Sequence, residues 1–349
     1  ANHPALPTLP RIERPLPSAL NAAPVRNVAA GESESLDGHA PVTMQGLQAA
    51  LPSEGIGRME LPQASYDGAA TLRFPLSLPP GRQGMEPALA LVYSSDGPNG
   101  WLGLGWNLPL SAFSVDTRWG SPPYDAEKES ETYLYDGRQL SPVAHRSTWV
   151  DRQPEKRFFP RIEGSFDRIV RHGSGPADYW WEVTATDGTR RFYGKRPGDQ
   201  AIVGLRDEAG RLAYWPLLEE RDLNGNFIRY EYELTEDAGL PNGTVPGYQL
   251  YLSKVTYTGF ETEEGPYSVR FLRDRDLGEA RRPDVEIDAR WGFKQVTADR
   301  LRHIEIRYRD VPVRRYELEY STGLFFKSLL NAIAEIDAGG EEFYRYRLD

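Results

Sequence analysis

The sequence predicts an all-β fold, a large antiparallel assembly of many hairpins in the form of a curved-sheet or sandwich-like shell module with few short helices. Aromatic residues make up 11% of the 349 positions, whereas only 3 are Met. The 33 Gly and 28 Pro residues suit many turns between strands of alternating polar and aromatic or β-branched residues. A single core usually stops growing at roughly 250–300 residues, so we expect one large, lobed body.

Composition divides the chain into two parts. Residues 1–54 are rich in Pro and Ala and carry little periodic apolar content. Such a segment cannot offset the entropy that it would lose on ordering, so we interpret it as a tail or linker. Residues 55–349 form the β-rich domain.

The first hairpin is predicted by two alternating segments, residues 70–76 and 88–94, each bounded by Pro or Gly. Between them a Pro-Pro pair is followed by Gly81 and Gly84. Proline fixes φ, and the two glycines can adopt positive φ, as a chain reversal requires.

The next segment, residues 96–106, places four glycines around Trp101 and Trp106. The spacing predicts a tight loop whose backbone passes close beneath the indole rings, with positive φ at the glycines. These glycines are Gly97, Gly100, Gly103 and Gly105.

Further hairpins follow, each with turn residues between alternating segments. They span residues 179–193, 203–215 and 219–232, the last around Asn224 and Gly225. Along residues 227–233 the alternation places one face in the core and the other in solvent. The buried face is Ile228, Tyr230 and Tyr232, and the opposite face is Phe227, Arg229, Glu231 and Glu233. Residues 324–336 suit either a helix or a hairpin arm, and we favour the strand.

A set of residues within positions 68–142 stands in a family-like order: Pro87, Tyr93, Gly100, Gly103, Gly105 and Trp106. With them, residues 55–349, and most specifically 68–142, resemble the N-terminal domain of the SpvB family (Salmonella virulence plasmid B protein) and the B component of insecticidal Tc toxins. The segment around Asn224 and Gly225 is similar to the hairpins of Rhs/YD repeats. The resemblance implies a β-rich module that, in Tc toxins, joins a second subunit to enclose a cytotoxic polypeptide. In SpvB it precedes an ADP-ribosyltransferase domain, which is not recognisable in this chain.

Charge and composition exclude several classes of function. The net charge of −10 opposes binding to nucleic acid or to an anionic membrane, because the summed field repels both. The pairs Arg281-Arg282 and Arg314-Arg315 are surrounded by acids, so we interpret them as rim charges. No apolar run approaches the 18 residues of a membrane span. The absence of Cys excludes disulfides and thiolate sites.

Four groups of residues are candidate functional sites. Glu129 and Glu131 form the Glu-x-Glu of an ADP-ribosyltransferase, but the Arg and Ser-Thr-Ser strands that should precede it are missing, so a solvated acidic loop is favoured. Asp222, Asn224 and Asn226 resemble half of a calcium loop, yet the glycine is misplaced and a turn explains them.

The five His lack metal-ligand spacing. The eight Trp suit sugar stacking, but Trp181 and Trp215 stand at inward phases, so most should be core.

We therefore predict a non-enzymatic scaffold module of a secreted bacterial toxin that contributes to encapsulation, assembly or translocation and needs no cofactor or metal. Its expected partners are other toxin-complex subunits or downstream domains of the same polypeptide, with a host cell or glycan as a further candidate contact. The expected location is extracellular, after a cytoplasmic stage before export. Two alternatives stay open. One is the front half of an ADP-ribosylating toxin without its transferase domain, and the other is a glycan-binding surface β-domain.

Overall fold

The computed structural model describes residues 63–64, 68–141, 149–162 and 164–348. The expected tail, residues 1–54, lies outside them. Nearly all regular structure is antiparallel β, and the described part of the chain contains one 3-10 turn, η3 (Leu324–Phe326). The predicted all-β fold class is confirmed.

A small sheet opens the described chain, and its strands pair in the order β1-β2-β3-β6. A two-stranded hairpin between β3 and β6 carries the predicted glycine segment. The sheet consists of β1 (Gln63–Ala64), β2 (Ala70–Pro75), β3 (Ala90–Ser94) and β6 (Trp106–Asn107), and the hairpin of β4 (Asn99–Gly100) and β5 (Gly103–Leu104).

Eight strands close into a barrel because β15 pairs with both the first and the last strand of the remaining seven. Its residues 214–216 pair with β7, and its residues 217–221 pair with β13. The strands are β7 (Ala112–Val115), β8 (Tyr133–Tyr135), β9 (Arg138–Ser141), β10 (Glu155–Pro160), β11 (Arg168–His172), β12 (Trp180–Thr184), β13 (Arg190–Tyr193) and β15 (Leu212–Arg221).

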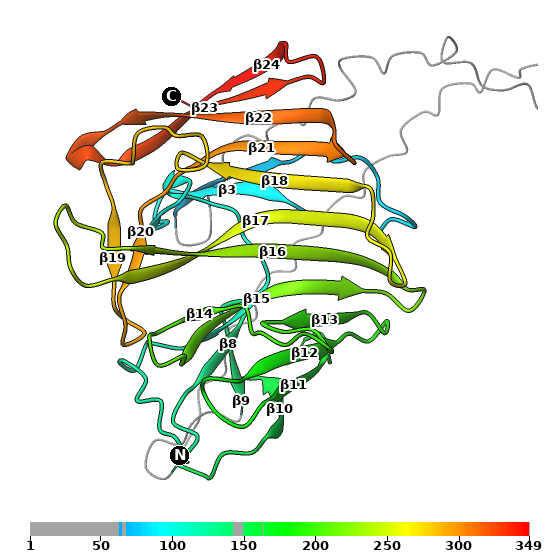
Figure 1. The fold of residues 1–349 in the computed structure, drawn as a ribbon, viewed down its shortest axis with the longest axis vertical. Coiled ribbons are helices and arrows are strands. Elements are labelled where there is room, and N and C mark those ends of the chain that lie inside the picture. The colour runs from blue at the N-terminus through cyan, green and yellow to red at the C-terminus, as the bar shows by residue number, and fades with distance from the viewer. Residues whose placement is uncertain (1–62, 65–67, 142–148, 163, 349) are drawn as a thin grey trace, which may run out of the picture. The chain divides into compact units, whose positions relative to one another are not determined.

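The long sheet continues from β15, so the same strand belongs to the barrel and to the sheet (Figure 1). Its further strands are β16 (Asn226–Asp237), β17 (Gly247–Phe260), β18 (Tyr267–Arg273), β21 (Leu301–Tyr308), β22 (Val311–Thr322), β23 (Ser328–Ile336) and β24 (Glu342–Arg347). Short strands at its margin are β14 (Leu205–Arg206), β19 (Glu286–Asp288) and β20 (Gln295–Thr297). The favoured strand within residues 324–336 is thus present as β23.

Aromatic rings fill the barrel interior. Phe113 stacks on Trp181 with ring centroids 4.3 Å apart, and Trp215 lies 6.0 Å from Trp181. Both indoles are buried, as their phases predicted. An indole buries about 150–250 Å², so each contributes several kcal/mol at about 25 cal/mol per Å².

The small sheet packs on the long sheet through Phe74 of β2. This fully buried ring meets Tyr316 of β22 at 5.8 Å and Tyr346 of β24 at 4.9 Å, both edge-on. The Tyr316 hydroxyl accepts a hydrogen bond from the Ser77 amide at 2.9 Å.

The one-sided burial expected for residues 227–233 is wrong at Phe227. Ile228 and Tyr230 are buried as predicted, but Phe227 on the opposite face is only 1% exposed. Two guanidinium groups, of Arg221 and Arg229, stack on its ring at 4.6 and 4.3 Å from the centroid. Arginine stems cover an aromatic ring on a solvent face in a way that alternation does not reveal.

Candidate functional site

The glycine segment takes positive φ at two of the four predicted positions, Gly103 (+86°) and Gly105 (+78°), whereas Gly97 and Gly100 do not. The expected crowding by indole rings is also wrong. A Cβ on Gly103 would lie 2.5 Å from the Ser328 carbonyl oxygen of β23. One on Gly105 would lie 2.6 Å from the Tyr93 ring. These glycines therefore allow the β4–β5 hairpin to approach the backbone of β23 and the side chain of β3.

The Pro-Gly turn differs from its prediction at one position. Gly84 has φ +78°, but the second residue with positive φ is Gln83 (+54°) rather than Gly81. A Cβ on Gly81 would lie 2.0 Å from the Met85 carbonyl oxygen, so close backbone approach is what requires this glycine. Pro87, after the turn, is buried.

The Asn224-Gly225 turn is closed by its own side chains. The Asp222 carboxylate accepts hydrogen bonds from the amides of Asn224 and Asn226, each at 2.8 Å, and Gly225 has φ +85°. The side-chain amides of both asparagines donate to Gln83 Oε1, which joins the two predicted turns. The described residues contain no metal-binding group of carboxylates or histidines.

Glu129 and Glu131 do not form the solvated loop that the sequence suggested. Each is 3% exposed and forms a bidentate ion pair with an arginine. The shortest contacts are 2.6 Å to Arg171 and 2.8 Å to Arg152. Such buried, bidentate pairs are among the stronger polar contacts, and they occupy the carboxylate oxygens that catalysis would need.

The electrostatic surroundings determine the charge of Glu129 in its pair with Arg171. Burial by itself would raise the pKa of Glu129, but the hydrogen bonds and charge of Arg171 outweigh it and hold that pKa below its usual value. The Arg171 guanidinium also stacks on Tyr179, 3.8 Å from the ring centroid. The Glu129 carboxylate is therefore held in its charged form beside Arg171.

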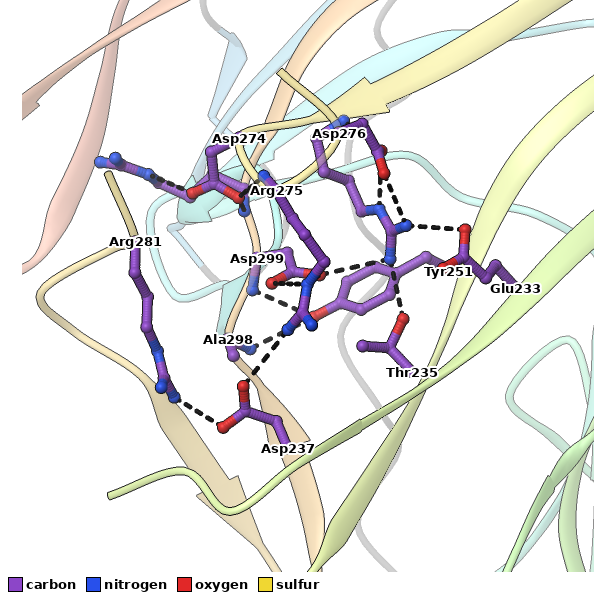
Figure 2. Close-up of polar contacts among 12 residues, drawn as sticks. Glu233, Thr235, Asp237, Tyr251, Asp274, Arg275, Asp276, Arg281, Ala298 and Asp299 are labelled. Atoms are coloured by element: carbon purple, nitrogen blue, oxygen red, sulfur yellow. Dashed lines mark hydrogen bonds and ion pairs between the residues drawn. The ribbon is translucent and has the colours of Figure 1, made fainter. Parts of the chain in front are cut away.

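A larger polar network holds the connection between β18 and β21, residues 274–300, against β16 and β17 (Figure 2). Arg273 is 2% exposed and donates to Glu233 at 2.7 Å, to Asp276 at 3.0 Å and to Asp299 at 3.2 Å. The Tyr251 hydroxyl accepts from the Asp299 amide at 3.2 Å. Strand β16 and both ends of the connection are therefore fixed together.

The outer half of the same network centres on Asp237, at the end of β16. Figure 2 shows Arg275 reaching both Asp237 (3.2 Å) and Asp299 (3.0 Å), and Arg281 reaching Asp237 at 2.8 Å. We call this network the polar clamp, and it consists of Glu233, Asp237, Arg273, Arg275, Asp276, Arg281 and Asp299. Arg281 thus behaves as the expected rim charge.

Arg282, its neighbour, is not a rim charge. It is 2% exposed and binds Asp284 at 2.9 Å and the Gly100 carbonyl oxygen at 2.7 Å. Asp284 in turn accepts from the Ser328 amide at 2.7 Å and from the Asn99 side chain at 3.1 Å. The pair links the connection to the glycine segment and to β23.

Trp291 extends the connection to the barrel. Its indole donates to the Val115 carbonyl oxygen of β7 at 2.9 Å, and its own carbonyl oxygen accepts from Tyr124 at 3.1 Å. Sequence reasoning did not predict the roles of Arg282, Asp284 and Trp291, because residues 274–300 show no alternation. The only signal is the repeated pairing of Arg and Asp two residues apart, at 282/284 and 288/290.

Comparison with known proteins identifies the family. A family model described as the Salmonella virulence plasmid 65kDa B protein matches residues 64–276. The chain belongs to the SpvB family. This SpvB-family chain is 32% identical over 228 residues to the mono(ADP-ribosyl)transferase SpvB of Salmonella choleraesuis strain SC-B67, covering 59% of this chain and 37% of the relative. It therefore spans a little over a third of the length of the curated relatives it matches.

Solved structures share the fold of this SpvB-family chain. The N-terminal domain of the effector SpvB from Salmonella typhimurium strain LT2 has a TM-score of 0.62 at 24% identity, covering 76% of this chain and 98% of that domain. The crystal structure of TcdB2-TccC3 has a TM-score of 0.66 at 21% identity, covering 84% of this chain and 17% of that chain. The resemblance predicted from residues 68–142 is confirmed. Among the described residues no helix is long and apolar enough to cross a membrane.

Proposed function

We propose that this chain is a non-enzymatic structural module of a secreted bacterial toxin, which contributes to toxin encapsulation, assembly or translocation. Its family and its fold, shared with TcdB2-TccC3, support this role. So does the pairing of its buried charges, because Glu129, Glu131 and Asp299 of the polar clamp each form an ion pair with an arginine. The β-rich domain carries the function, and residues 1–54 serve as a tail or linker.

An exposed apolar tip is the observation that best supports a partner. Between β22 and β23, Leu324, Phe325 and Phe326 are 85%, 88% and 72% exposed. Phe325 and Phe326 have φ of 57° and 59°, a region that bulky residues rarely adopt. Strain of this kind costs about 1–3 kcal/mol per residue and concentrates at functional positions.

The base of the tip is rigid, so the rings are held outward before any partner binds. The Gly323 amide donates to the Lys327 carbonyl oxygen at 2.8 Å, and Asp284 fixes Ser328. Buried aromatic anchors carry much of the energy of protein interfaces. We infer that the tip enters an apolar pocket of another toxin-complex subunit or of a downstream domain of the same polypeptide, outside the producing cell.

A capture experiment with a parallel enzyme assay tests this function. The chain is immobilised and offered candidate toxin-complex subunits, and separately incubated with labelled NAD and host-cell extract. We expect capture without label transfer. The double variant Phe325→Ser/Phe326→Ser should lose capture at unchanged melting temperature, whereas Leu223→Ser, at an equally exposed leucine (77%) in a distant turn, should retain it. Label transfer by the chain alone would favour the alternative of an ADP-ribosylating toxin, and failure to capture any subunit would overturn the scaffold role.

A further inference from the structure

A cavity of about 660 Å³ opens where the barrel, the glycine segment and the long sheet meet. Trp101 of the glycine segment, Tyr214 of β15 and Tyr232 of β16 line it, together with Gln249 of β17 and with Trp291 and Gln295 of the connection. Its volume lies within the roughly 300–1,000 Å³ of small-molecule sites, which often occur at such junctions. Neither the family nor the proposed scaffold role assigns a ligand to it.

The cavity lining is almost free of charge. Asp136 is its one ionisable carboxylate, and no Lys or Arg lines it. The Asp136 carboxylate already accepts hydrogen bonds from the Ser111 hydroxyl at 3.1 Å and from the Ala112 amide at 2.9 Å. An anionic ligand would leave water without a counter-charge here, and the one carboxylate is already hydrogen-bonded within the chain, so the lining favours a neutral molecule over an anion.

The neutral polar groups of the lining are orientated, and part of their hydrogen-bonding capacity is unused. Gln249 donates to the Thr297 hydroxyl at 2.7 Å and accepts from the Gln295 side chain at 3.2 Å, which leaves Gln295 Oε1 as an acceptor. The hydroxyl of Tyr232 is buried and has no hydrogen-bond partner among the described residues. Buried polar groups are nearly always bonded, so this wall suits a ligand with hydroxyl groups.

Aromatic rings form the remaining walls. The indole of Trp291 is held by its hydrogen bond to Val115, and its ring centroid lies 6.3 Å from that of Tyr214. The ring centroid of Trp101 lies 5.6 Å from that of Tyr251, a residue labelled in Figure 2. The negative face of an aromatic ring attracts weakly positive C–H groups, such as those on the face of a sugar ring. Uncharged amides and phenols beside aromatic faces match a molecule that carries both hydroxyl and C–H groups.

We propose that this cavity is a binding site for a neutral saccharide of one or two rings. The site is independent of the proposed scaffold role, since its half-buried lining residues are not those of the exposed tip. The lining predicts that a neutral sugar binds better than its acid counterpart, because no cation stands in the cavity to meet a carboxylate.

Titration of the whole chain tests the site by tryptophan fluorescence, since Trp101 and Trp291 form part of its walls. The probes are glucose, galactose, N-acetylglucosamine, lactose and maltose, with glucuronate as the charged counterpart of glucose. We expect a saturable change with at least one neutral sugar and binding about tenfold weaker for glucuronate than for glucose. Tyr232→Phe and Gln295→Leu should each weaken binding about tenfold, because a hydrogen bond to the sugar is lost.

Tyr230→Phe is the matched control, since Tyr230 is a buried tyrosine on β16 outside the cavity lining, and it should bind as the native chain does. Melting temperatures show which variants fold, and if one of the two cavity variants does not, the other decides. Absence of a saturable change with every neutral sugar would overturn the site. Equal binding of glucose and glucuronate, or binding unchanged in the cavity variants, would overturn it as well.

Discussion

At the scale of single residues, two glycines with the same backbone conformation have different reasons to be glycine. Gly84 and Gly105 both have φ +78°. A Cβ on Gly84 would meet nothing within 4 Å, whereas one on Gly105 would lie 2.6 Å from the Tyr93 ring and 2.7 Å from the Ser94 carbonyl oxygen. The first position therefore requires only a conformation, and the second requires both a conformation and space.

This difference predicts the effects of two alanine substitutions. Gly84→Ala should lower the free energy of unfolding by about 1 kcal/mol, the cost of a left-handed conformation with a Cβ. Gly105→Ala should lower it by about 3 kcal/mol or more, because β3 and the glycine segment must also separate. Denaturant unfolding of both variants measures the two values. Equal losses would show that Tyr93 and its strand adjust freely and that crowding has no role at Gly105.

At the scale of elements, the connection of residues 274–300 is held by many ion pairs and hydrogen bonds, beside the two buried apolar residues Val296 and Ala298. It has only two short strands, β19 and β20, yet it contacts β16, β23, the glycine segment and the barrel. Buried charges are costly unless every one is paired, so such an element depends on each partner. Asp284 is the clearest case, since its two oxygens serve Arg282, Asn99 and Ser328.

Asp284→Asn should therefore destabilise the chain at neutral pH by about 3 kcal/mol, because it leaves Arg282 buried without its counter-charge. Burial alone would raise the pKa of Asp284, but the bonds from Arg282 and Ser328 hold it well below its usual value. A carboxyl with a lowered folded pKa stabilises above its unfolded pKa, about 3.9, and loses that contribution as pH falls. The difference in melting temperature between native chain and variant should shrink below about pH 4.

Asp288→Asn supplies the matched control from the same connection. Asp288 binds Arg290 with the same spacing, but the Arg290 side chain is 78% exposed. An exposed pair contributes about 0–1 kcal/mol, so this variant should melt close to the native chain. Equal melting temperatures for the two variants at neutral pH would contradict the structural role of Asp284.

At the scale of the whole molecule, local sequence patterns predicted the hairpins, but they did not predict the contacts between residues that are distant in sequence. Asn224-Gly225 specifies its own turn, and the phases of Trp181 and Trp215 reveal their burial, because both signals lie within a few residues. The closure of the barrel joins β15 to β7, about a hundred residues apart. Likewise, Glu129 and Glu131 seemed solvated because their partners, Arg171 and Arg152, stand far away in sequence. Ion pairs between residues that are distant in sequence produce no periodic pattern, so the sequence alone does not predict them.

The division of the chain into a tail and a β-rich domain leads to the last prediction. The apolar core of the described residues begins at Phe74 and Leu76, and residues 1–54 carry almost no periodic apolar face. Deleting residues 1–54 should therefore leave the melting temperature and the far-ultraviolet circular dichroism unchanged. Deleting residues 1–76 should lower the melting temperature, because it removes Phe74 from between Tyr316 and Tyr346. A loss of cooperative melting in the shorter deletion would show that the tail belongs to the core.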